Sequence, residues 1–89
     1  MTKQEILDMI CVYQHKEGYA SYKMLMLAQR VSELMDEQGV IPDSEEARIL
    51  YWEITEYKYS LYFNEDQNAD LEKIVKMFSQ ETIKRLSRA

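Results

Sequence analysis

Apolar residues recur along this chain at the three- to four-residue spacing of amphipathic helices, and no stretch alternates with the period of two that marks a β-strand. The first helix is predicted over residues 3–15, with Thr2 as its N-cap and Glu5 at the capping-box spacing. The second is predicted over residues 19–38, with Gly39 as a C-terminal cap. The expected core faces of these helices are Ile6, Leu7, Ile10 and Tyr13, and then Met24, Leu27, Ala28, Val31, Leu34 and Met35.

Two more helices are predicted over residues 44–63 and 68–87, because segments rich in helix breakers divide the chain into four pieces of helical length. The last helix is expected to bury Leu71, Ile74, Val75, Phe78 and Leu86. Short connections favour antiparallel neighbours. We therefore expect an all-α chain, a single helical domain over residues 1–89 that folds as a compact antiparallel four-helix bundle. The alternative is a three-helix core with the first helix packed across it or exchanged into a dimer.

The helix predicted over residues 44–63 carries two apolar sectors. At 100° per residue, one narrow sector holds Ala47, Leu50, Ile54, Tyr57 and Leu61, which is enough to attach the helix to a core. A second sector, well away from the first, holds Tyr51, Trp52, Tyr59, Tyr62 and Phe63. A helix that is apolar on two sides either lies at the centre of its own domain or lies at an interface. Since 89 residues leave little room to enclose a helix on all sides, the second sector is a candidate interface.

Tyrosine and tryptophan are enriched at binding hot spots because they bury a large area and keep one polar group. We therefore expect the second sector to contact a partner, with Trp52 and Tyr59, one heptad apart, as its anchors. In the alternative interpretation these aromatic side chains cover neighbouring helices of the same chain.

The formal charge of −5 is unevenly distributed. Residues 33–72 carry twelve carboxylates against two basic side chains, whereas the two ends of the chain are mildly basic. Glu46, Glu53 and Glu56 fall on one stripe of the helix predicted over residues 44–63, beside its aromatic sector. An acidic surface next to aromatic residues can dock a basic protein site, including one that normally holds nucleic acid. The alternative is a solvated face that keeps a small protein soluble.

The sequence offers no pattern for catalysis, and we expect no enzyme activity, no cofactor and no metal. Cys11, the single cysteine, is expected to be a buried and inert thiol, and His15 a complement to the dipole at a helix end. The segment 64–70 has oxygen-bearing side chains at alternate positions, but Ala69 and Val75 stand where a calcium-binding EF-hand needs glycine and glutamate. No apolar run is long enough to cross a membrane, and we expect a cytoplasmic protein with no membrane partner.

No motif assigns the chain to a family. In size, charge and helical character it resembles, in a general way, the small inhibitors and immunity proteins of phages and mobile elements. That resemblance implies a non-enzymatic protein-binding module, a small acidic regulator or inhibitor that covers a basic site on a larger protein. A homodimeric structural or regulatory subunit with the aromatic sector as its seam is the second reading. A small DNA-binding regulator is the third, although direct contact with nucleic acid is not expected because the candidate recognition helix is acidic.

Overall fold

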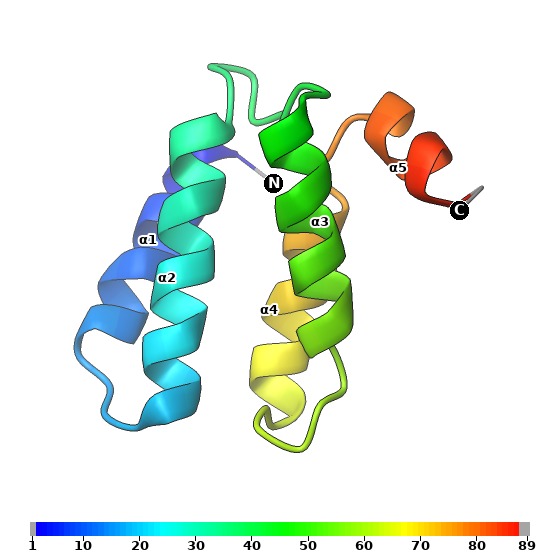
Figure 1. Cartoon of the computed structure of the whole chain (residues 1–89). Coiled ribbons are helices and arrows are strands. Elements are labelled where there is room, and N and C mark those ends of the chain that lie inside the picture. Colours follow the sequence, from blue (N-terminus) through cyan, green and yellow to red (C-terminus); the bar gives the residue numbers. More distant parts are fainter. Residues whose placement is uncertain (1, 88–89) are drawn as a thin grey trace.

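The computed structural model describes residues 2–87, and within them every regular element is a helix. The helices are α1 (Lys3–Gln14), α2 (Tyr19–Leu34), α3 (Glu45–Tyr57), α4 (Glu65–Val75) and α5 (Gln80–Ser87). The prediction of an all-α chain is confirmed, but the described part has five helices, so the predicted four-helix bundle is wrong in its count. Figure 1 shows two antiparallel pairs, α1 with α2 and α3 with α4, while α5 lies beyond the α3–α4 pair.

The α1–α2 hairpin follows the sequence pattern closely. Thr2 caps α1, and its side chain and that of Glu5 form the predicted capping box. Gly18 precedes α2 with a φ of +104°, a conformation that glycine adopts without a Cβ penalty. Ile6 on α1 and Met24 on α2 are fully buried in the core that the two pairs share.

The second helix ends at Leu34, four residues before the predicted end at residue 38. The reason is a turn built on Asp36, whose carboxylate accepts hydrogen bonds from the backbone N–H groups of Gln38 and Val40, both at 2.9 Å. Gly39 takes a φ of +84° inside that turn. It is therefore a turn glycine, and the prediction that it caps a helix is wrong.

The third helix ends at Tyr57, six residues before the predicted end at residue 63. Lys58 has an extended backbone and Tyr59 has a left-handed one with a φ of +63°, so the chain leaves the helical path there. The Tyr59 N–H donates to the side chain of Asn68 at 2.8 Å, which holds this turn against α4. As a result Tyr59, Leu61, Tyr62 and Phe63 lie on a loop, and their predicted positions on a helix are wrong.

The helix predicted over residues 68–87 is two helices. Helix α4 begins three residues earlier than predicted, because Asn64 and Gln67 form a capping box at its start. It ends at Val75, and the segment that follows pairs with the stretch before α3: the Ile41 N–H donates to the Met77 carbonyl at 2.9 Å, and the Ser79 N–H donates to the Ile41 carbonyl at 3.0 Å. This pairing, with Phe78 buried beside it, overrides helix continuation.

One carboxylate fastens α5 to α3. Asp43 accepts from Arg48 of α3 in a two-pronged contact, with both distances 3.1 Å, and from the fully buried hydroxyl of Thr82 at 2.8 Å. Arg85 of α5 forms an ion pair with the same carboxylate at 3.3 Å. The hydrogen bonds that Asp43 accepts, from Arg48 first and Thr82 second, hold the pKa of this carboxyl below its usual range. Burial has a smaller effect in the opposite direction.

Three apolar predictions are wrong. Leu7 is nearly half exposed and Leu61 is fully exposed, although both were placed on core faces. Cys11 is exposed as well, on the outer side of α1, so it is not the buried thiol that the sequence predicts. The core comprises Ile6, Met9, Tyr13, Met24, Leu27, Ala28, Val31, Met35, Ile41, Ala47, Leu50, Ile54, Phe63, Leu71, Ile74, Met77 and Phe78.

Candidate functional site

The face of α3 that points away from the core carries two large apolar side chains. Ile49 is 55% exposed and Trp52 is 59% exposed. Ala47, Leu50 and Ile54, on the opposite face, are buried and attach the helix to the core. Because residues three and four apart are neighbours on a helix, Ile49 and Trp52 lie side by side, and Glu56 follows Trp52 one turn later.

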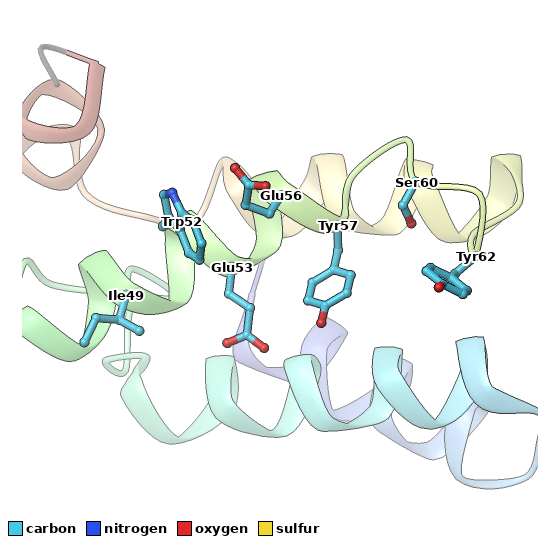
Figure 2. A pocket seen from close by; sticks show the side chains of 7 residues that line it. All are labelled: Ile49, Trp52, Glu53, Glu56, Tyr57, Ser60 and Tyr62. Carbon is cyan, nitrogen blue, oxygen red and sulfur yellow. The ribbon is translucent and has the colours of Figure 1, made fainter.

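These residues line a groove with a volume of about 510 Å³. Its α3 wall consists of Ile49, Trp52, Glu53, Glu56 and Tyr57, and the loop after α3 closes it with Ser60 and Tyr62. In Figure 2, Trp52 and Glu56 point away from α2, whereas Glu53 and Tyr57 point toward it. The groove therefore brings three aromatic rings and two carboxylates to one place on the surface.

A basic side chain of α2 already lies against one side of this groove. The Lys23 ammonium is 3.2 Å from the Glu53 Oε1 atom and 4.5 Å from the centre of the Tyr57 ring. Partial burial lowers the pKa of Lys23, but its contacts with Glu53 and Tyr57 outweigh that effect and leave the pKa above its ordinary value. A carboxylate and an aromatic face therefore hold a cation here, as charge and the ring quadrupole favour.

Glu56 lacks such a partner. Among residues 2–87 it forms no ion pair or hydrogen bond through its carboxylate, and it is exposed. A second unused polar group lies on the loop: the Ser60 hydroxyl is buried and has no hydrogen-bond partner in the described part of the chain. In Figure 2 this hydroxyl is turned toward the space between the rings of Tyr57 and Tyr62. Buried polar groups are almost always satisfied, so an unpaired one beside a groove is unusual.

The structure places the predicted partner-binding residues at four different positions. Trp52, Glu53, Glu56 and Tyr62 line the groove together. Glu46 is exposed one turn before Ile49 and extends the acidic side beyond the groove.

Tyr51 and Phe63 belong to the interior instead. The Tyr51 ring packs against that of Phe78 with centres 5.2 Å apart, and Phe63 is buried against Tyr57 at 6.1 Å. For these two residues the alternative interpretation, in which aromatic side chains cover neighbouring elements of the same chain, describes the contacts.

Tyr59 is exposed but lies apart from Trp52, so the two predicted anchors do not share a surface hollow. Its hydroxyl donates to Glu72 of α4 at 2.7 Å, and it lines a separate hollow beside that helix. The hydrogen bond to Glu72 raises the pKa of Tyr59. The left-handed backbone at Tyr59 turns the chain toward α4, which a helical projection through residue 59 does not include.

Three groove residues are absent from the sequence prediction. Ile49 falls between the two apolar sectors of α3 and belongs to neither, so the pattern does not single it out. Tyr57 belongs to the predicted core sector and lies at the edge of the core, yet its ring also lines the groove. Nothing in the sequence marks Ser60 as a groove residue, because its position depends on the path of the loop that follows α3.

Residues 2–87 contain no cluster of three or more histidine, cysteine, aspartate or glutamate side chains placed to hold a metal ion. No helix in this part is both long and apolar enough to span a membrane. No family model, curated protein or solved structure matches the chain. The function is therefore inferred from the groove itself.

Proposed function

We propose that this chain is a non-enzymatic protein-binding module that covers a basic site on a larger protein, and that the α3 groove makes the contact. The observation that carries the proposal is that one groove holds a more than half-exposed Trp52 beside Glu56, whose carboxylate has no partner among residues 2–87. Exposed tryptophan is costly in water and is enriched at the centres of protein interfaces.

The apolar surface continues from the groove onto α2, which supports a partner larger than a small molecule. The ring of Tyr62 contacts that of Tyr19 in an edge-to-face arrangement with centres 5.7 Å apart. Tyr19, Tyr22 and Met26 are all exposed on α2. An exposed apolar surface spread over two helices is typical of a protein interface.

The charge of the same surface favours a basic partner. Glu53 and Glu56 lie in the groove, Glu46 lies just beyond it, and the surrounding segment 33–72 carries only two basic residues. Complementary charge speeds association and selects against acidic surfaces. A basic protein site, such as one that otherwise holds the phosphates of a nucleic acid, meets both requirements.

A homodimer through this groove is the second candidate, favoured by the continuous aromatic surface of Tyr19 and Tyr62. In a twofold dimer, however, the same patch meets itself. The unpaired Glu56 of one copy would then face the acidic groove of the other, and like charges in contact weaken association. The charge therefore favours a partner of opposite sign over a second copy.

The test is affinity capture from the native host with matched variants. Trp52→Ala and Glu56→Gln alter the groove, whereas Leu7→Ala and Glu17→Gln remove an exposed apolar side chain and an exposed carboxylate elsewhere on the molecule. The proposal predicts that a protein is retained by the wild-type chain and by both controls, is lost with both groove variants, and is released by salt. It is overturned if retention is the same for groove and control variants.

A further inference from the structure

We infer that the groove receives the guanidinium of an arginine side chain, stacked on Trp52 and paired with Glu56. This inference rests on the proposed function and specifies the chemistry of the contact. It starts from the observation that the α2 side of the groove already holds a cation of this chain, Lys23, between a carboxylate and a ring. The outer side presents the same two kinds of group, and no cation of residues 2–87 is paired with them.

The outer pair has the same spacing along α3 as the inner one, with the ring and the carboxylate in the opposite order. Glu53 and Tyr57, which hold Lys23, are four residues apart on α3, and Trp52 and Glu56 are also four residues apart. At this spacing the side chains of a helix are neighbours. Trp52 offers the most favourable ring for a cation, and it is more than half exposed, so a ligand can reach its face.

Arginine fits this arrangement better than lysine does. A guanidinium is planar and can stack on an indole, while its N–H groups donate in pairs to a carboxylate. It is also less strongly hydrated than an ammonium, so it enters a partly apolar groove beside Ile49 at lower cost. An ammonium satisfies the charge of Glu56 but gains less from the ring.

The buried Ser60 hydroxyl is the second observation that points to a ligand. It has no partner among the described residues, and it lies on the loop that closes the groove. The hydroxyl oxygen is enclosed in the free chain, so a bound chain can supply the missing hydrogen bond only when the loop shifts to uncover it, after which the hydroxyl can rotate to donate or accept.

Trp52 is the single tryptophan, so its fluorescence reports on the groove directly. We would titrate the full chain with capped peptides of six arginines, six lysines or six citrullines at low salt. Citrulline keeps the planar shape of arginine and removes its charge. The inference predicts saturable binding of the arginine peptide, binding of the lysine peptide that is weaker by about two- to five-fold, and no binding of the citrulline peptide.

Glu56→Gln and Glu17→Gln are the matched variants, since both remove one exposed carboxylate. Glu56→Gln is expected to weaken binding of the arginine peptide by about two- to five-fold, the range for an exposed ion pair. Glu17→Gln is expected to change this affinity only as far as the loss of one negative charge from the whole chain does. Equal binding of arginine and lysine peptides, or equal effects of the two variants, overturns the inference.

Failure of this inference is distinguishable from failure of the proposed function. A partner whose capture depends on Trp52, combined with no preference for the arginine peptide, overturns the arginine contact and leaves the protein-binding function standing. If no protein is captured through the groove, the proposed function itself fails, whether or not the arginine peptide binds in the titration.

Discussion

The ammonium of Lys23 on α2 lies 4.5 Å from the centre of the Tyr57 ring on α3, and the same ammonium is paired with Glu53 at 3.2 Å. This contact joins two helices and occupies one of the two carboxylates in the groove. It follows that Lys23 competes with any external cation for the inner side of the groove.

Replacing Lys23 by alanine is therefore expected to strengthen binding of the six-arginine peptide by about two- to five-fold, because Glu53 and Tyr57 become free. Trp52 fluorescence measures the change. Lys16→Ala is the control, since Lys16 lies over the Tyr13 ring at 5.4 Å and outside the groove. An equal gain in both variants would mean that only net charge matters and that the groove does not select the cation.

Trp52 is expected to contribute little to folding, because it is exposed while its neighbour Ile54 is fully buried. Trp52→Ala should change the free energy of unfolding by no more than about 0.5 kcal/mol, as exposed substitutions do. Ile54→Ala should lower it by about 2–5 kcal/mol through lost burial and a cavity. Urea denaturation followed by circular dichroism measures both, and a loss at Trp52 as large as that at Ile54 would place Trp52 in the core.

Asp43 is expected to hold α5 in place in a pH-dependent way. Its pKa is lowered in the folded chain, so its contribution to stability is complete above the ordinary aspartate pKa of about 4 and is lost as the pH falls through the folded value. Asp43→Asn should speed hydrogen exchange of the α5 amides at pH 6 and leave α1 unchanged.

The control for this experiment is Asp8→Asn, because Asp8 is exposed on α1 and its carboxylate accepts a hydrogen bond from Gln4 of the same helix. Below about pH 4 the difference between wild type and Asp43→Asn should shrink, since the carboxylate is then protonated in the undocked state while the docked one still holds its charge. Equal α5 exchange in wild type and Asp43→Asn at pH 6 would show that apolar packing alone docks the helix.

Tyr13 is expected to stabilise the chain up to alkaline pH. Burial raises its pKa above the ordinary value, and its hydrogen bond to Asp70, 2.6 Å long, raises it further. Because the folded pKa is raised, the stability due to this phenol is complete below about pH 10 and declines as the pH rises above that.

Tyr13→Phe should lower the free energy of unfolding by about 1–2 kcal/mol at pH 8, the range for a lost hydrogen bond. The deficit of the variant should then narrow at pH 11, because the phenol is then ionised in the unfolded chain but still protonated in the folded one, which favours unfolding of the wild type. Urea denaturation at the two pH values gives the comparison. A deficit that is the same at pH 8 and pH 11 contradicts the raised pKa.

Helix interiors could be predicted from the sequence, whereas helix ends could be predicted only where a local capping signal was recognised. Thr2 with Glu5 marked the start of α1 correctly. The equivalent pair Asn64 and Gln67 caps α4, although the polar residues around it favour a loop in the sequence. The capping signal is therefore present in the sequence, but its polar surroundings obscure it.

Other features depend on tertiary contacts that a single sequence does not contain. The break between α4 and α5 follows from backbone pairing of Ile41 with the segment around Phe78, thirty-seven residues away. The exposure of Trp52 and the burial of Phe63 could not be separated either, because the projection assumed one continuous helix through both. Four of the seven groove residues, Trp52, Glu53, Glu56 and Tyr62, could therefore be predicted from the sequence, whereas Ile49, Tyr57 and Ser60 could not.

The most direct test of the central claim is photo-crosslinking in cells of the native host. A benzoylphenylalanine replaces Ile49, which is exposed in the groove, or Leu7, which is exposed on α1 as a control. The crosslinked peptides are then identified by mass spectrometry. A groove that binds a basic protein site predicts a crosslink from position 49, and not from position 7, to a segment of another protein rich in lysine and arginine. Crosslinks from position 49 only to a second copy of this chain, or none above the level at position 7, would contradict it.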